Sequence, residues 1–266
     1  MERRRVGNVE VVALVDNVMP YAATAVYPEA GAALDRFRGY FDAEGRVPLN
    51  FGCFLLVDGS RSVLVDTGWG PEFQGRLMAE LAAAKVDPAS IDAIVFTHLH
   101  GDHTGWNLDR ATGKPLFPKA RYHVPRADWE HYGNATPPPD SFVRDVVPLE
   151  AMGCMELIEG DHTLAPSLTA IPTPVHTPGH TSVVISSGGE RGFILGDVVI
   201  SKADAEDPDL VNSFDWDRGI ARQTRLKLLE RLVREGCLVG ASHLPAPGLG
   251  RFVAKDGGAA WAEDRG

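Results

Sequence analysis

The segment FTHLHGDHTGW, residues 96–106, places three of the chain's nine histidines and an aspartate within six consecutive positions. It directly follows the apolar run IDAIV, so the cluster stands at the end of a predicted buried strand. Such dense spacing of imidazole and carboxylate groups has no role in packing, but it is typical of metal sites. We therefore expect a fold in which this strand end carries a metal site.

Within this segment the candidate ligands fall into two pairs. Alternate residues of an extended segment share a face, so His98 and His100 should point the same way. Gly101 allows a sharp turn after them, which would aim Asp102 and His103 at a second, neighbouring point. One ion seldom takes four ligands from so short a loop, because tetrahedral angles are hard to reach. The segment therefore predicts parts of two adjacent metal sites, each completed from elsewhere in the chain.

Three later segments supply residues that could complete these sites. TPVHTPGHTSVVI places His176 and His180 in a turn rich in Pro and Gly that leads into a strand. FILGDVVI ends a strand at Asp197, and GASHLPAPGLG has His243 in the same setting. A lone histidine or aspartate at a strand end is usually a cap or a surface group. Their recurrence at several strand ends indicates one shared site.

Apolar runs rich in Val and Ile recur in both halves of the chain. They predict strands at 9–15, 51–57, 62–66, 91–96, 120–124, 167–172, 181–186, 192–196 and 237–242. Helices are predicted over 71–86, 126–132 and 217–236. Two β-rich halves, each followed by a helix, fit an α/β sandwich of two sheets with helices outside, built by a single domain spanning 1–266.

Residues 17–50 carry several aromatic side chains but no clear periodicity. A loop of this length inside a compact domain is often a lid or a substrate loop. The alternative is a surface excursion with a short helix at GAALDRFRGYF.

The charge and the cysteines limit the partners and the compartment. A net charge of −10 and a pI near 5.3 argue against nucleic acid as a partner. Cys53, Cys154 and Cys237 form no CxxC pair and indicate buried thiols in a reducing compartment. The N-terminal run MERRRVGNVEVVALVDN is too short and too charged for a signal peptide or a membrane span. We expect a cytoplasmic protein that acts on a small molecule without a membrane partner, with a homodimer left open.

Together these segments resemble motifs of the metallo-β-lactamase superfamily, over nearly the whole chain. FLLVDGSRSVLVDTGWG is similar to its first motif, THLHGDHTGW to its H-x-H-x-D-H motif, LGDVV to its bridging-aspartate motif and SHLPAPGLG to its final-ligand motif. TPVHTPGH is similar to an element of the lactonase and organophosphate-hydrolase branch, represented by methyl-parathion hydrolase. The resemblance implies a four-layer αββα sandwich, with two mixed β-sheets and helices on both outer faces.

The resemblance also implies two divalent metal ions, with zinc as the default and Mn, Fe, Co or Ni as alternatives. The implied ligands are His98, His100 and His176 for one ion and Asp102, His103 and His243 for the other, with Asp197 bridging both. In the TPVHTPGH element the family's ligand is the first histidine, so His180 is a supporting or structural residue.

The implied activity is that of a binuclear hydrolase, in which a metal-bridging hydroxide attacks a lactone or an ester-like small molecule. True β-lactamases of the superfamily have a cysteine at the position of Asp197, so lactam hydrolysis is not expected. Homoserine-lactone hydrolases of the family often have a tyrosine three residues after this aspartate, where Ile200 stands here. Asp102, Asp197 or a metal-bound water would then act as the catalytic proton donor to the leaving group. The alternatives are a phosphotriester or thioester hydrolase on the same site, a mononuclear iron enzyme that uses oxygen, and a metal binder without catalysis.

Other residues are expected to support the site or to form its pocket. Asp66 and Thr97 would orient the ligands, unless Asp66-Thr67-Gly68 is only a turn. The expected apolar pocket wall consists of Trp106, Ile200 and Phe214. Ordinary core, capping or surface positions are expected for Trp216, His123, His131 and His162.

Overall fold

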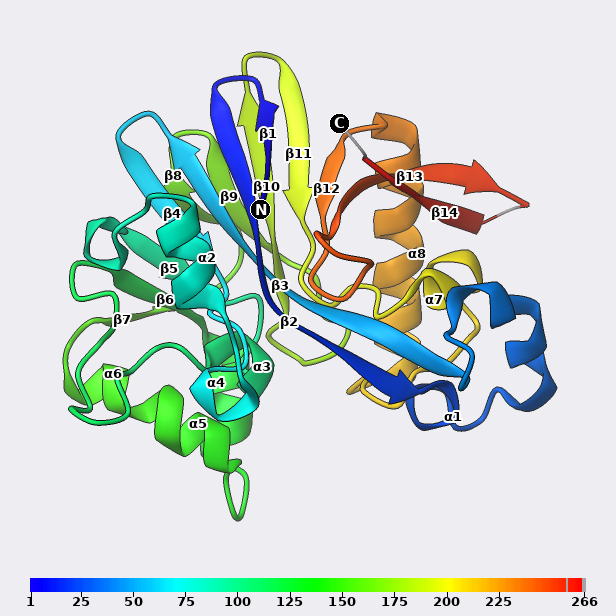
Figure 1. Cartoon of the computed structure of the whole chain (residues 1–266), viewed down its shortest axis with the longest axis horizontal. Helices are drawn as coiled ribbons and strands as arrows, with labels where there is room; N and C mark the ends of the chain where they lie inside the picture. Colours follow the sequence, from blue (N-terminus) through cyan, green and yellow to red (C-terminus); the bar gives the residue numbers. More distant parts are fainter. Residues whose placement is uncertain (257, 265–266) are drawn as a thin grey trace.

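The computed structural model describes residues 1–256 and 258–264, and two seven-stranded β-sheets dominate it (Figure 1). The N-terminal sheet runs in the order β1 to β7, antiparallel as far as β4 and parallel from β4 to β7. Its strands are β1 Glu2–Val6, β2 Val9–Ala22, β3 Arg46–Asp58, β4 Arg61–Val65, β5 Ala93–Val95, β6 Arg121–Pro125 and β7 Met155–Ile158.

The C-terminal sheet runs in the order β14 to β8, and only its β11–β12 pair is parallel among the described strands. Its strands are β8 His162–Ala165, β9 Leu168–Pro172, β10 Thr181–Ser187, β11 Glu190–Ile194, β12 Leu238–Gly240, β13 Leu249–Lys255 and β14 Gly258–Glu263. The strands β1, β7, β8, β13 and β14 were not predicted from apolar runs, because they are very short or are interrupted by polar and small residues.

The helices are short except for α8. They are α1 Ala23–Val26, α2 Leu77–Ala83, α3 Gly101–Thr104, α4 Arg126–Gly133, α5 Asp140–Asp145, α6 Val147–Ala151, α7 Lys202–Glu206 and α8 Arg218–Glu235, with 3₁₀ helices η1 Gly31–Tyr40, η2 Pro71–Phe73 and η3 Pro88–Ser90. Among the described residues, no helix combines the length and apolar character needed to cross a bilayer.

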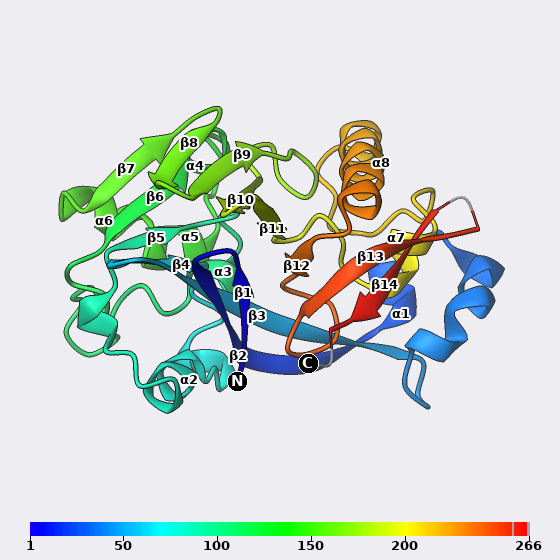
Figure 2. The same ribbon diagram turned by 90° about the horizontal axis from the view of Figure 1, so that it is seen from above.

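Apolar side chains fill three layers between these elements. One layer lies between the two sheets, with Val11, Val95 and Ile185 among its buried members. A second layer packs α2, α4, α5 and α6 against the outer face of the N-terminal sheet, and a third packs α8 against the C-terminal sheet. Figure 2 shows α2 and α8 on opposite outer sides of the paired sheets. The structure therefore confirms the expected four-layer αββα sandwich with two mixed sheets.

Both ends of segment 17–50 belong to strands, because β2 runs to Ala22 and β3 begins at Arg46. β2 and β3 are paired along their length, with Tyr21 opposite Val47 near the open end of the pair. The connection between the two strands contains α1 and η1. Tyr27 and Phe37 are buried in a local apolar cluster with Ile200. The short helix expected at GAALDRFRGYF is present as η1, and a role of the segment as a lid or substrate loop stays a prediction.

The predicted helix over 71–86 is interrupted near its start. Gln74 adopts φ 58°, so the helical turn at Pro71–Phe73 ends and α2 begins only at Leu77. The carboxylate of the buried Asp16 accepts the backbone N–H groups of Leu77 (2.8 Å) and Trp69 (2.8 Å). This long-range cap sets the start of α2, and an apolar pattern cannot reveal it.

Candidate metal centre

The seven predicted ligands come together at one end of the sandwich, where several strands of both sheets end. His98 and His100 follow β5, and Asp102 and His103 lie on α3. His176 comes from the turn between β9 and β10, while Asp197 and His243 follow β11 and β12. Carboxyl ends of strands are where open α/β sheets commonly build their sites. The fold therefore brings together residues separated by more than 140 positions in the sequence.

The first group of possible ligands consists of His98, His100 and His176. One ring nitrogen from each lies within 4.8 Å of the others. Nε2 of His98 is 3.1 Å from Nδ1 of His100, and the ring centroids of His100 and His176 are 4.5 Å apart. This spacing suits three imidazoles that converge on a single ion.

The second group consists of Asp102, His103, Asp197 and His243, whose donor atoms also lie within 4.8 Å of one another. Nε2 of His103 is 3.4 Å from Asp102 Oδ2 and 3.4 Å from Asp197 Oδ1. Nε2 of His243 is 3.5 Å from Asp102 Oδ2. The pair of points predicted from H-x-H-x-D-H is therefore present, but Gly101 does not provide a left-handed turn. α3 itself turns the chain, and a Cβ at Gly101 would be 3.0 Å from Ser141 Cβ.

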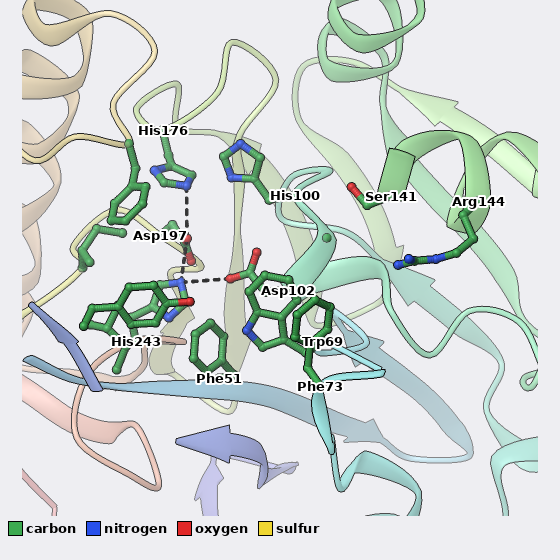
Figure 3. A pocket seen from close by; sticks show the side chains of 15 residues that line it. Phe51, Trp69, Phe73, His100, Asp102, Ser141, Arg144, His176, Asp197 and His243 are labelled. Carbon is green, nitrogen blue, oxygen red and sulfur yellow. Dashed lines mark hydrogen bonds and ion pairs between the residues drawn. The ribbon is translucent and has the colours of Figure 1, made fainter. Parts of the chain in front are cut away.

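Asp197 lies between the two groups. Its Oδ2 is 3.7 Å from Nε2 of His98 and 3.5 Å from Nε2 of His176, both in the first group. The same oxygen is 2.9 Å from Nε2 of His243 in the second (Figure 3). One carboxylate thus contacts both groups, as a bridging ligand must.

The donor atoms themselves fit metal ions. His103 Nε2 and Asp197 Oδ1 are buried and have no hydrogen-bond partner. Donors around a tetrahedral zinc ion, with bonds of about 2.0–2.1 Å, stand about 3.4 Å apart, which matches the distances between these groups. Buried polar atoms without partners are rare, so each calls for an explanation, and a pair of cations would supply one here.

The charges at this site favour cations as well. Burial disfavours the charge of Asp102, but the imidazoles of His103 and His243 outweigh it and lower the pKa of its carboxyl to about 2. Burial also opposes ionisation of Asp197, yet His243 and His103 hold its pKa well below its ordinary value. In return, Asp197 and Asp102 raise the pKa of His103 despite its burial. The two carboxylates are ionised and require positive charge beside them.

A cavity of about 400 Å³ opens over these residues. Its apolar wall is formed by Tyr21, Leu49, Phe51, Trp69, Phe73, Ile200 and Phe214. Ser141 and Arg144 on α5 lie on the side away from His176 and Asp197 (Figure 3). Cavities that bind small molecules are mostly apolar with a few polar groups, and this one has that character.

Two of the three residues expected to form the pocket wall line this cavity. Ile200 and Phe214 line the cavity, and Phe214 lies 5.7 Å from His176 between ring centroids. Trp106 does not line it, because its indole Nε1 donates to Asp16 (2.8 Å) and its ring packs against the helix-covered core. Trp216 was expected in the core, but it is 48% exposed.

A family model described as the metallo-beta-lactamase superfamily matches residues 53–235, which is more than half of the chain. The chain belongs to the metallo-β-lactamase superfamily. Within it, the chain is 26% identical over 216 residues to an N-acyl homoserine lactonase from Bacillus cereus, covering 72% of this chain and 80% of that protein.

Solved structures of the superfamily agree in fold. AidC, a dizinc quorum-quenching lactonase in complex with a product, has a TM-score of 0.86 and 25% identity over 100% of this chain and 97% of its own. The hydrolase AbOPH has a TM-score of 0.87 and 24% identity over 99% of this chain and 97% of its own, which shows the shared fold. The chain is therefore a metal-dependent hydrolase of the superfamily, related to lactonases.

Asp66 and Thr97 occupy the supporting positions that the superfamily motif implies. Asp66 accepts hydrogen bonds from the Thr97 backbone N–H (2.7 Å) and hydroxyl (2.7 Å), and its Oδ2 is 2.8 Å from Nδ1 of His103. The Thr97 hydroxyl is also 3.1 Å from Nδ1 of His98. Asp66 adopts φ 62°, which non-glycine residues rarely adopt and which indicates a conformation imposed by its surroundings. These contacts are the ones expected if Asp66 and Thr97 orient His98 and His103.

His180 contacts the metal centre through the backbone. Its Nε2 accepts the N–H of Asp197 (3.0 Å), and its Nδ1 donates to the carbonyl of Thr173 (3.0 Å). Burial lowers the pKa of His180 to about 4, so the ring is neutral and can accept this bond. Neither ligand group includes His180, so its predicted exclusion from the ligands agrees with the geometry.

Two supporting residues were missed by the sequence analysis. Asp128 on α4 accepts bonds from the N–H of Leu99 (3.2 Å), the hydroxyl of Thr177 (2.8 Å) and the N–H of Gly179 (2.6 Å). The backbone carbonyl of Asn50 accepts from Nδ1 of His243 (2.7 Å). An acidic residue on the buried face of a predicted helix was the only sequence signal for Asp128.

Proposed function

We propose that this chain is a binuclear hydrolase that opens a lactone or cleaves an ester-like small molecule. The observation that carries this proposal is the position of Asp197, which contacts both ligand groups at the base of an apolar cavity. The first ion would be held by His98, His100 and His176, and the second by Asp102, His103 and His243. Zinc suits this mixture of imidazole and carboxylate.

Two divalent ions at this position supply a water nucleophile at neutral pH and polarise the oxygen of the substrate's carbonyl. The protein's part is to hold the donors in place. Asp66 orients His103, the Asn50 carbonyl orients His243, and His180 restrains the backbone of Asp197. Such supporting hydrogen bonds fix both the tautomer and the direction of a histidine ligand.

Asp102 is the residue best placed to move a proton. Its side chain lines the cavity and its carboxyl is ionised, so its oxygens are free of a proton beside the substrate. It would take the proton that the attacking water loses and return it to the leaving oxygen. Ile200 offers no hydroxyl for this step, and Asp197 would be held between the two ions.

The cavity wall supports a substrate with an apolar acyl or aryl group. Phe51, Trp69 and Phe73 form a continuous aromatic surface. The ring centroids of Phe51 and Trp69 are 5.5 Å apart, and those of Trp69 and Phe73 are 4.3 Å apart. The relatedness to N-acyl homoserine lactonases supports a lactone with an apolar tail as the first substrate to test.

The test is hydrolysis by metal-free and zinc-reconstituted protein of N-acyl homoserine lactones of increasing acyl length, an aryl ester, a thioester and a phosphotriester. We expect chelation to abolish turnover, zinc to restore it, and lactones or esters to be preferred. Asp197→Asn should lower kcat/KM by more than about 100-fold and should also lose bound metal. Removing a residue that only supports a ligand costs up to about 100-fold, and Asp197 would contact both ions itself.

His131→Gln is the matched control, because this exposed histidine on α4 belongs to neither ligand group. If the thioester or the phosphotriester is hydrolysed faster than the lactones and the ester, that compound's class replaces lactones and esters as the proposed substrates. A single bound iron would favour oxygen chemistry, and bound metal without turnover of any of these substrates would contradict the proposal.

A further inference from the structure

A third group of possible ligands lies outside the metal centre, at the edge where the two sheets meet. It consists of His123 on β6, Glu156 on β7 and His162 on β8, and we call it the junction cluster. The donor atoms of its members lie within 4.8 Å of one another. β7 is the edge strand of the N-terminal sheet and β8 that of the C-terminal sheet, so the cluster spans both (Figure 2).

His123 is not the ordinary histidine that the sequence suggested. Its neighbours Tyr122 and Val124 face the helix-covered core, so His123 faces the apolar layer between the sheets. In register it stands beside Val95 on β5 and Glu156 on β7. It is only 5% exposed, yet neither ring nitrogen has a hydrogen-bond partner. An imidazole buried in this way is unfavourable unless something binds it.

We propose that His123, Glu156 and His162 bind a divalent transition ion such as zinc, which ties the edge of one sheet to the edge of the other. Nδ1 of His123 is 3.7 Å from Glu156 Oε2, and Nε2 of His162 is 3.9 Å from Glu156 Oε1. Donors around tetrahedral zinc stand about 3.4 Å apart, so the three side chains would draw closer together to bind an ion. Two imidazoles and one carboxylate favour zinc, cobalt, nickel or copper over magnesium or calcium.

The surroundings of the cluster allow an ion to enter. Glu156 and His162 are partly exposed, which leaves a fourth position open to water. Both ring nitrogens of the buried His123 lack a hydrogen-bond partner, so no protein group competes with an ion for this ring. The competing cation is Arg121, whose Nε is 3.6 Å from Glu156 Oε2. Both side chains of this pair are more than 40% exposed, and such surface pairs are weak and readily exchanged.

Zinc at the junction cluster would act on stability rather than on hydrolysis. None of the three residues lines the cavity or belongs to the ligand groups around Asp197. An ion that binds only when β6, β7 and β8 are assembled stabilises the folded chain, and this stabilisation grows with the logarithm of the free zinc concentration above the dissociation constant.

The experiment counts zinc and measures thermal unfolding on the full chain. Chelator-treated protein is titrated with zinc chloride, desalted and analysed for metal, and its Tm is followed over the same titration. Wild type should hold one more zinc per chain than His162→Gln or Glu156→Gln, and both variants should lose part of the zinc-dependent rise in Tm. Both positions are partly exposed, so these variants should fold, and their hydrolytic activity should match that of wild type.

Two comparisons separate this site from the centre at Asp197. The double variant Asp197→Asn/His162→Gln should hold one zinc fewer than Asp197→Asn alone. This difference is expected whether or not the chain proves to be a hydrolase. His131→Gln, an exposed histidine outside the cluster, should keep the wild-type zinc count. Equal zinc and equal Tm response in wild type and His162→Gln, or an equal loss in His131→Gln, would mean an adventitious ion only and would overturn the proposal.

Discussion

At the scale of single residues, the metal centre depends on small backbone details next to the ligands. Gly196 precedes Asp197 and adopts φ 61°. A Cβ at this glycine would be 2.7 Å from Thr97 Cβ and 2.8 Å from Nε2 of His180. The same Nε2 accepts the Asp197 N–H, so the space at Gly196 and the placement of Asp197 are linked.

Gly196→Ala should therefore destabilise the chain and weaken metal binding. The left-handed conformation alone costs about 1–2 kcal/mol in an alanine, and the clash with Thr97 and His180 adds to it. Gly113→Ala is the matched control, because Gly113 has φ 67° but no atom within 4 Å of its Cβ position. Urea unfolding and metal analysis should show a larger loss for Gly196→Ala, with metal lost only there. Equal losses would show that Gly196 serves the backbone turn alone.

At the scale of elements, α8 holds the segment that follows Asp197. Arg225 on α8 is 1% exposed, and its Nε donates to the carbonyl of Val198 (2.7 Å) while its Nη2 binds Asp215 (2.8 Å). The helix was predicted over 217–236 and spans Arg218–Glu235, ending at Gly236 in the left-handed conformation. The helix itself was predictable, but the buried arginine was not, because most arginines on such a helix face solvent.

Arg225→Met should destabilise the chain by about 3–5 kcal/mol, because Asp215 would remain buried without its partner. Arg222→Met on the same helix removes a pair with Asp209 in which both side chains are about half or more exposed. That exposed pair should contribute about 0–1 kcal/mol. Chemical unfolding of the two variants measures the difference. A small effect for Arg225→Met would mean that the pair does not anchor the segment after Asp197.

At the scale of the whole molecule, the two sheets meet at the site through a few polar contacts. Asp128 joins them, because Leu99 follows a strand of the N-terminal sheet, while Thr177 and Gly179 precede one of the C-terminal sheet. Burial dominates and raises the pKa of Asp128 to about 6, although these three bonds oppose the shift. The folded chain therefore holds a proton on Asp128 at pH values where the unfolded chain has lost it.

The sign of the resulting pH effect follows from this proton. Between the ordinary value of 3.8 and about 6, the folded state binds more protons, so the contribution of Asp128 to unfolding free energy falls as pH rises. The total change is about 3 kcal/mol for a shift of about two units. The destabilisation caused by Asp128→Asn should accordingly be larger at pH 4 than at pH 7. Glu130→Gln, at an exposed position of α4, should show no such trend in the same unfolding series. A pH-independent difference for Asp128→Asn would contradict the raised pKa.

The order of residues was enough to predict the two-sheet sandwich and to name the seven residues that the fold gathers into two candidate ligand groups. The supporting roles of Asp66, Thr97 and His180 stay predictions, with which their contacts agree. These signals are local: ligand spacing, apolar runs and short motifs are written within a few neighbouring positions. The tertiary structure was needed for Asp128, for the cavity wall of Tyr21 and Phe51, and for the junction cluster. Such residues gain their roles from segments that are distant in the chain and carry no motif. Trp106 was wrongly predicted to line the cavity. Its closeness to the ligands in sequence does not tell which way its side chain points after α3 turns the chain.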